Sequence, residues 1–167
     1  RNQARFSTGA RGKLGFINPL ELTFVPIAHC LISHLEINAV LERLQSRKWW
    51  QHQITVRYGV NTGKLLVAPA LEIFDGSLET GQALYEEELL GRRFRVSAAS
   101  FFQPNTLQAQ KLAQIVLDKC GTEVGTLLDA YAGVGAFAIL AAPRSERVIA
   151  MEEAGPSVHD AVFNARD

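Results

Sequence analysis

The pattern of hydrophobic and polar residues changes near residue 97. Before that point, short apolar stretches alternate with polar residues and are separated by glycine or asparagine, which is typical of strands joined by turns. Strands are predicted near residues 4–6, 14–16, 22–27, 54–58, 65–68 and 71–74, with two more in 79–97. The turn signal Asn61-Thr62-Gly63 predicts a hairpin. One helix, ending near Ser46, is predicted after Ser33 and Glu36, which have capping-box spacing.

After residue 97 the apolar residues follow helical spacing or form short buried runs. They predict, in order, a helix at 107–117, a strand at 126–131, a helix at 136–142, a strand at 148–151 and a helix from 158 to 165. This order opens a doubly wound α/β domain. Two strands do not make a stable sheet alone, so we expect that domain to be incomplete. The predicted fold class is α/β, with a mixed β/α domain over 1–93 and the first half of a Rossmann-like domain over 94–167.

Charge is unevenly distributed, although the net charge of the 167 residues is zero. Residues 1–60 hold eight Lys and Arg against three acids, and the remainder reverses the balance. A basic half indicates either a surface for a polyanion or ordinary solvated charge. The chain has no run of eighteen apolar residues, and Cys30 and Cys120 are its only cysteines. We therefore expect no membrane span, two reduced thiols and a cytoplasmic location. Because the chain begins with Arg1 rather than Met, we also expect a longer parent protein.

The strongest local signal is a glycine loop that joins a predicted strand to a predicted helix. It reads Asp129-Ala130-Tyr131-Ala132-Gly133-Val134-Gly135-Ala136-Phe137. Glycines at 133 and 135 let the backbone turn tightly and approach a ligand. Glu152 follows the next strand about twenty residues later, where an acid can accept hydrogen bonds from ribose hydroxyls.

Three interpretations of this loop remain open on these residues alone. Gly133, Gly135 and Ala138 also satisfy the dinucleotide fingerprint of an NAD-dependent oxidoreductase. Asp129, four residues before the first glycine, favours a methyltransferase. A tight turn without a ligand is the third interpretation.

A longer motif precedes the loop: Val96-Ser97-Ala98-Ala99-Ser100-Phe101-Phe102-Gln103-Pro104-Asn105. Its order, followed by a helix, the glycine loop and the acid after the second strand, resembles the RNA uracil-5-methyltransferase family. The first residues, Arg1 to Phe6, and Cys30 before a helix with Asn38 are similar to that family's central domain. The resemblance covers essentially the whole chain.

The resemblance implies S-adenosylmethionine as cofactor and 5-methyluridine in tRNA or ribosomal RNA as product. It implies that Gln103 contacts the cofactor, that Tyr131 borders it and that Glu152 binds its ribose. The cofactor-binding residues expected on this basis are Gln103, Asp129, Tyr131, Gly133, Gly135, Ala136 and Glu152. For Gln103 the residues alone are neutral, because a glutamine near a helix start is commonly a cap or a surface residue.

Two positions depart from the family pattern. Ala132 stands where the family usually has cysteine, and Ala136 where it often has Asn or Thr. Losing a polar group at 136 removes a hydrogen bond worth about 0.5–1.5 kcal/mol, so cofactor affinity is expected to be reduced. Cys30 aligns with an iron–sulfur ligand of some members. Because the other three ligands lie upstream in the family, no metal site is expected here.

The family reaction uses a cysteine that adds to C6 of uracil and a base that removes the C5 proton. In the family both lie beyond the position of Asp167, so we expect no catalytic residue here and no activity of the chain alone. A structured RNA partner and a monomeric parent are expected, and an RNA-binding module without activity is the remaining alternative. The candidate phosphate contacts are Arg1, Arg5, Arg11, Lys13, Arg47, Lys48 and Arg57. Trp49 and Trp50 could stack on a base or belong to a packed core.

Overall fold

The computed structural model describes residues 1–45, 47, 49–73, 76 and 78–166. Its contacts divide the chain into two compact units. Unit 1 comprises Arg1–Tyr58 with Gly63–Ala83, and unit 2 comprises Gly59–Thr62 with Leu84–Asp167. The expected boundary after residue 93 would cut strand β7 (Arg92–Ser97). The division falls ten residues earlier because β7 pairs along its whole length with β6 (Leu84–Leu89).

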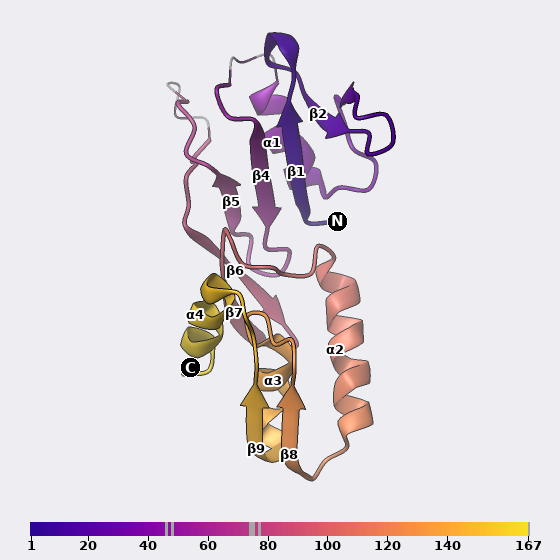
Figure 1. Ribbon diagram of the computed structural model, residues 1–167, viewed down its shortest axis with the longest axis vertical. Helices are drawn as coiled ribbons and strands as arrows, with labels where there is room; N and C mark the ends of the chain where they lie inside the picture. Colours follow the sequence, from indigo (N-terminus) through magenta and orange to yellow (C-terminus); the bar gives the residue numbers. More distant parts are fainter. Residues whose placement is uncertain (46, 48, 74–75, 77, 167) are drawn as a thin grey trace. The chain divides into compact units, whose positions relative to one another are not determined.

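Unit 1 is built on a five-stranded antiparallel sheet with the order β3-β2-β1-β4-β5 (Figure 1). Its strands are β1 (Gln3–Thr8), β2 (Leu14–Ile17), β3 (Phe24–Pro26), β4 (Gln53–Tyr58) and β5 (Leu65–Ala68). The predicted hairpin is confirmed as β4 and β5, with Val56 opposite Val67. Residues 71–73 are not a strand, which contradicts the prediction for 71–74, and Phe74 lies outside the described residues.

Helix α1 (Leu35–Leu44) buries one face in the core of unit 1. Ile37, Val40, Leu41 and Leu44 lie on that face at helical spacing and pack with the inward side chains of the strands, such as Phe6. The predicted capping box is wrong. The cap is His34, whose Nδ1 accepts a hydrogen bond from the Glu36 N–H at 3.3 Å, one residue later than the Ser33 spacing implies.

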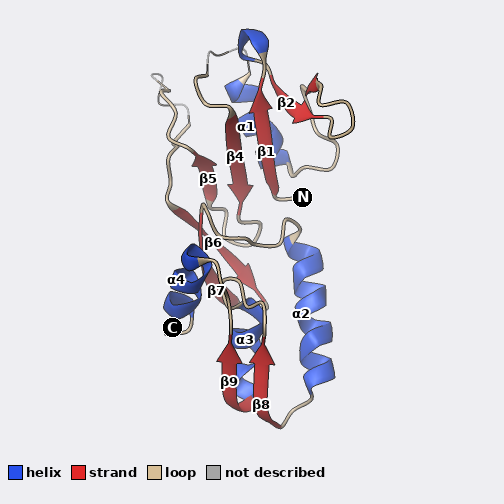
Figure 2. Ribbon diagram, in the orientation of Figure 1, coloured by secondary structure: helices blue, strands red, loops and turns tan. Residues whose placement is uncertain are grey.

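Unit 2 combines a hairpin, a long helix and a βαβ unit (Figure 2). Its elements after the β6–β7 hairpin are α2 (Thr106–Cys120), β8 (Val124–Asp129), α3 (Ala136–Ala141), a 3₁₀ turn (Ala142–Arg144), β9 (Ser145–Ala150) and α4 (Gly155–Asn164). β8 and β9 pair in parallel, with Leu127 opposite Val148. The predicted order of helices and strands after residue 97 is confirmed.

The β8–β9 pair is covered unevenly. α3 contacts both strands, whereas Leu128, which projects to the opposite side from Leu127, is 59 % exposed. Met151 directly after β9 is 49 % exposed. None of the helices in the described part of the chain combines the length and hydropathy that a membrane crossing needs.

Candidate cofactor site

The glycine loop is held at its start by the parallel strand pair. The carbonyl of Asp129 accepts a hydrogen bond from the Met151 N–H at 2.8 Å, and the carbonyl of Met151 accepts one from the Ala132 N–H at 3.0 Å. The loop then turns into α3, where the Gly135 N–H donates to the Ala132 carbonyl at 2.8 Å. The ladder of β8 and β9 therefore extends into the loop and fixes its path.

The two glycines of the loop are required for different reasons. Both have positive φ, 55° at Gly133 and 85° at Gly135, which L side chains rarely adopt. A Cβ at Gly135 would also lie 2.9 Å from Cδ1 of Ile139. Around Gly133 nothing lies within 4 Å of such a Cβ. Gly135 is thus needed for the packing of α3, whereas the space beside Gly133 is open to a ligand.

Four of the seven predicted cofactor residues line one pocket. It is lined by Leu89, Phe101, Phe102, Gln103, Ala109, Tyr131, Ala132, Gly133, Val134, Ala136 and Phe137. The Tyr131 side chain is 92 % exposed and forms the outer side of the loop. The cavity has a volume of about 90 Å³. Ligand pockets usually measure about 300–1,000 Å³, so a cavity of this size has room for only part of a cofactor.

Gln103 is not the cap of the helix that follows it. Asn105 caps α2, because its Oδ1 accepts a hydrogen bond from the Gln108 N–H at 3.2 Å. Gln103 is exposed and lines the pocket, whereas its neighbour Phe102 is 4 % exposed. The capping role that the sequence left open is therefore taken by another residue, and the Gln103 amide remains available to a ligand.

Asp129 has a buried oxygen that fits a ligand. Its Oδ2 atom is shielded from solvent and has no hydrogen-bond partner among the described residues. A buried carboxylate oxygen without a donor is costly. A donor such as an ammonium or hydroxyl group of a bound cofactor would satisfy it. Together with the open space at Gly133, this atom meets the requirements of a cofactor with hydrogen-bond donors.

Glu152 contacts the loop itself. Its Oε2 accepts from the Gly133 N–H at 2.8 Å, and its Oε1 accepts from the N–H groups of Glu153 at 3.0 Å and Ala154 at 2.9 Å. The hydrogen bonds from Ala154 and Gly133 lower the pKa of the Glu152 carboxyl below its ordinary value. The charged carboxylate thus ties the glycine loop to the start of α4, a structural contact that the resemblance did not indicate.

The motif before Gln103 is held by a buried acid that the sequence analysis missed. Asp160 on α4 is fully buried and accepts hydrogen bonds from the Ser97 N–H and Oγ at 2.7 Å each and from Ser100 Oγ at 2.6 Å. Arg95 Nε lies 3.4 Å from its Oδ1. Ser97 and Ser100 therefore attach α4 to the motif segment that leads to Gln103.

Asn164, one turn later on α4, extends this contact to the glycine loop. Its Nδ2 donates to the carbonyls of Arg95 and Val134 at 3.0 Å each, and its Oδ1 accepts from the Arg95 N–H at 2.8 Å. Ser157, Asp160 and Asn164 are buried, whereas the apolar residue Val162 is 50 % exposed. The buried face of α4 is polar, which reverses the usual amphipathic pattern. In the sequence, the 3- and 4-residue spacing of these three polar residues indicates that they share one face of a helix.

Glu87 is the second buried acid that the sequence pattern did not single out. Tyr85, Glu87 and Leu89 alternate on the buried face of β6. The Glu87 carboxylate accepts from the N–H groups of Val60 at 2.9 Å and Asn61 at 3.1 Å and from the Oγ1 of Thr106 at 2.5 Å. It therefore fixes Thr106, the first residue of α2, three residues after Gln103. The alternation of buried and less buried positions along β6, with a period of two, places Glu87 on the buried face.

The candidate phosphate contacts of unit 1 differ in exposure. Four are exposed: Arg1, Arg5, Arg11 and Lys13. Arg47 is half-buried and its Nε donates to the Arg43 carbonyl at 3.1 Å. Arg57 on β4 is only 3 % exposed, which contradicts its prediction as a phosphate contact, because a side chain that solvent does not reach cannot meet a phosphate. Lys48 lies outside the described residues.

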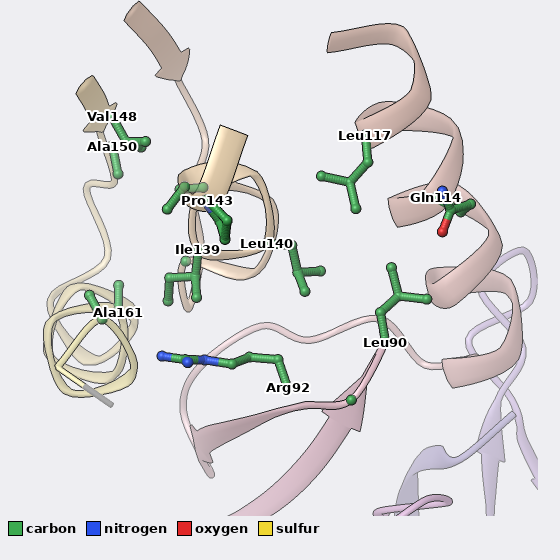
Figure 3. A pocket seen from close by; sticks show the side chains of 15 residues that line it. Leu90, Arg92, Gln114, Leu117, Ile139, Leu140, Pro143, Val148, Ala150 and Ala161 are labelled. Carbon is green, nitrogen blue, oxygen red and sulfur yellow. The ribbon is translucent and has the colours of Figure 1, made fainter. Parts of the chain in front are cut away.

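A larger, mainly apolar groove of about 690 Å³ adjoins the glycine loop at Gly135. Leu117 of α2, Leu140 of α3 and Leu90 of the β6–β7 turn surround the same space (Figure 3). Of the predicted cofactor residues only Gly135 lines it. The guanidinium of Arg92 donates to the Asn164 carbonyl at 3.3 Å. The groove is larger, but Gly135 is its only predicted cofactor residue, whereas the smaller pocket holds four of them and is the candidate site.

Neither cysteine belongs to this site. Cys120 is the last residue of α2, and fifteen helical residues separate the ends of that helix by roughly 22 Å. The Cys30 N–H donates to Asn38 Oδ1 at 2.8 Å and the Cys30 carbonyl accepts from Asn38 Nδ2 at 3.1 Å, which explains the pairing of these two residues in the sequence pattern. Among the described residues no group of three His, Cys, Asp or Glu could hold a metal ion.

A strand, glycine loop, helix and parallel strand ending in an acid define a βαβ unit for nucleotide-type cofactors. The sequence model of the tRNA (uracil-5-)-methyltransferase family matches residues 84–167, which coincide with the main segment of unit 2. The chain belongs to this family, whose members use S-adenosylmethionine. The resemblance inferred from the order of motifs is confirmed.

Individual relatives agree with this assignment. A zebrafish (Danio rerio) tRNA (uracil-5-)-methyltransferase homolog B is 45 % identical over 86 residues, covering 51 % of this chain and 18 % of that protein. The RNA methyltransferase YljE of Lactococcus lactis is 25 % identical over 205 residues, covering 91 % and 45 %. The chain thus spans less than half the length of these two relatives.

A solved structure shares the fold. The tRNA (uracil-54, C5)-methyltransferase of Pyrococcus abyssi, in complex with S-adenosyl-L-homocysteine, matches with a TM-score of 0.81 at 20 % identity. The match covers 99 % of this chain and 52 % of the Pyrococcus chain. The mixed α/β fold is therefore that of a methyltransferase structure.

Proposed function

We propose that this chain is part of a longer enzyme that transfers a methyl group from S-adenosylmethionine to C5 of a uridine in tRNA or ribosomal RNA. Unit 2 carries the first wall of the cofactor site, and unit 1 carries part of the RNA-binding surface. The observation that supports this most strongly is that Gln103, Tyr131, Gly133 and Ala136, separated by up to 33 positions, line one pocket in a chain of this family.

Each residue of the wall has a distinct role in this proposal. Asp129 Oδ2 accepts a hydrogen bond from the cofactor, because it is buried without a donor. Gln103 offers a side-chain amide from the segment before α2, and the exposed ring of Tyr131 borders the cofactor. Glu152 holds Gly133 and keeps one lone pair of Oε2 for a ribose hydroxyl. The cofactor itself supplies the activated methyl group when bound.

Isothermal titration of the longer parent with S-adenosyl-L-homocysteine tests the proposal. Replacing Gln103 by Ala removes one hydrogen bond and should weaken binding about 2- to 13-fold. Tyr131→Ala should weaken it further than Tyr131→Phe, which keeps the ring. Leu112→Ala on the exposed side of α2 is the matched control and should bind like the wild type. Binding of NADH in place of this ligand would instead assign the loop to an oxidoreductase.

The chain of 167 residues should not transfer methyl groups by itself. In the family resemblance the nucleophile and base come from a later segment, and Cys120 lies at the far end of α2 from Gln103. Incorporation of tritiated methyl groups into tRNA by this chain alone would overturn that part of the proposal.

A binding module without activity is the second candidate. It is favoured by the exposed cations of unit 1, Arg1, Arg5, Arg11 and Lys13. Filter binding of the chain to RNA at several salt concentrations distinguishes the two, together with the titration above. RNA binding with a salt dependence but no cofactor binding by the parent would favour the module.

A further inference from the structure

Unit 1 contains a pocket that the cofactor site does not use. It has a volume of about 240 Å³ and forms where the connection between β1 and β2 meets the segment before β4. Its lining residues are Thr8, Gly9, Arg11, Gly12, Trp49 and Trp50. Both tryptophans of the chain therefore lie in this one pocket.

The walls of the pocket are held by specific backbone contacts. Thr8 donates from its N–H to the His52 carbonyl at 3.0 Å and from Oγ1 to the Gln51 carbonyl at 2.7 Å. Gly12 has a φ of +71°, and a Cβ there would lie 1.7 Å from the Arg47 carbonyl oxygen. Only glycine permits this approach. The two segments are thus locked together, and the pocket between them is built rather than a gap in loose loops.

The two indole rings have different environments. Trp49 Nε1 donates to the Leu44 carbonyl at 3.0 Å, and the ring packs against the core of unit 1. Trp50 is 89 % exposed. One ring is therefore a fixed wall, whereas the other presents an aromatic face to solvent. An exposed tryptophan beside a fixed one is suited to stacking against a flat ligand.

The charge around the pocket indicates the chemistry of that ligand. Arg11 lines the pocket, and Arg5 and Lys13, which flank the lining residues 8–12 in the sequence, are exposed. The segments 5–13 and 47–53 contain no acidic residue. A flat, uncharged ring attached to an anionic chain satisfies both the aromatic face and the cations.

We propose that this pocket binds an unpaired base of single-stranded RNA, with the base stacked on Trp50 and the adjacent phosphates near Arg11. The inference rests on the proposed function, in which RNA is the substrate. It goes further because it assigns a stacking site to residues outside the cofactor pocket. Stacking on an aromatic side chain is sequence-tolerant, so this site positions the RNA without selecting a base.

Fluorescence titration of the 167-residue chain tests the site directly, because both tryptophans report from the pocket. A short unstructured RNA should quench the emission. By anisotropy of a labelled RNA, Trp50→Ala should weaken binding about 5- to 150-fold, the range for loss of one stacked base. Trp50→Phe should keep most of the affinity. Leu20→Ala, another highly exposed side chain of unit 1, should have no effect. Arg11→Gln should lower the salt slope by about one.

Several outcomes would overturn the inference. Equal affinity of Trp50→Ala and wild type would do so, as would equal affinity for a duplex of the same sequence, because a paired base cannot stack in the pocket. Displacement of the RNA by an equal concentration of an acidic peptide would assign the surface to a protein partner instead.

The same variants separate this inference from the proposed function. In the longer parent, Trp50→Ala should bind S-adenosyl-L-homocysteine like the wild type. Cofactor binding together with RNA binding that does not depend on Trp50 would remove the stacking site and leave the methyltransferase proposal intact. RNA binding that depends on Trp50, without cofactor binding, would support the stacking site and contradict the methyltransferase proposal.

Discussion

Units 1 and 2 are stabilised in different ways. Unit 1 has a continuous apolar core in which Phe6, Leu14, Ile37, Leu41 and Ile54 are fully buried. In unit 2 the elements around the glycine loop are joined by buried polar groups. Apolar burial depends on area and tolerates imprecise geometry, whereas a buried carboxylate is favourable only when its donors are in place. Unit 2 should therefore be more sensitive to single polar substitutions.

The largest effect is expected at Asp160. Replacing it by Ala leaves the Ser97 and Ser100 hydroxyls without their shared acceptor and Arg95 without its ion-pair partner. Breaking a buried charged network costs about 3–5 kcal/mol. Hydrogen exchange should show loss of protection in β7 and α4, while the strands of unit 1 stay protected.

Asp160→Asn is the matched control, because it keeps the shape and part of the hydrogen bonding. It should retain more protection than the alanine variant. If both variants unfolded β1 and β4 together with α4, the two units would share one cooperative transition and the contrast would be wrong.

A comparable loss in unit 1 requires an apolar truncation. Leu41→Ala removes a fully buried side chain of α1 and should lower the free energy of unfolding by about 2–5 kcal/mol. Urea denaturation monitored by tryptophan fluorescence follows this unit, since both tryptophans belong to it. Exposed Leu35 on the same helix gives the control, and Leu35→Ala should change stability little. Protection of α4 should be unaffected by either change.

Thr106→Val tests the Glu87 cluster with a smaller perturbation. The side chain keeps its shape but no longer donates to the buried carboxylate, and the expected cost is about 1–3 kcal/mol. The loss should appear in the amide exchange of the first turn of α2. Because the Gln103 segment precedes that turn, binding of S-adenosyl-L-homocysteine to the parent should weaken as well. Substitution of exposed Thr126 by Val serves as the control.

The smallest effect is a pH dependence at the glycine loop. The pKa of Glu152 is lowered by the Ala154 and Gly133 N–H groups, so the folded loop favours the charged carboxylate. This stabilisation is fully present above the ordinary carboxyl value of 4.5 and is lost as the pH falls through the lower folded value. The Gly133 amide resonance should titrate in that acidic range. In Glu152→Gln the titration should disappear, and its persistence would assign it to another acid.

The contrast between the units also explains which predictions from sequence succeeded. Hydrophobic periodicity predicted α1, the β4–β5 hairpin and the order of elements in unit 2, because burial of apolar side chains imposes periods of 3.6 and 2. It failed where polar groups decide the packing. Asp160 and Glu87 look like surface acids in the sequence, and the apolar residues of α4 are the exposed ones.

The candidate site was predicted in part for the same reason. Gly133, Gly135 and Tyr131 form a local motif whose backbone requirements are visible in sequence. That Gln103 joins them in one pocket, while Asn105 caps the helix, depends on contacts between distant segments. The role of Glu152 as an acceptor for the Gly133 N–H depends on the same kind of long-range geometry.

By itself, then, the sequence determined the family, the order of elements and the position of the glycine loop, since these follow from local patterns along the chain. Only the tertiary structure decided that Arg57 is buried, that Trp50 is exposed beside a fixed Trp49 and that Asp160 holds the motif serines. Burial and hydrogen-bond partners are properties of segments brought together by folding. The same residue type can be a surface charge or the centre of a packed cluster, depending on what folding places opposite it.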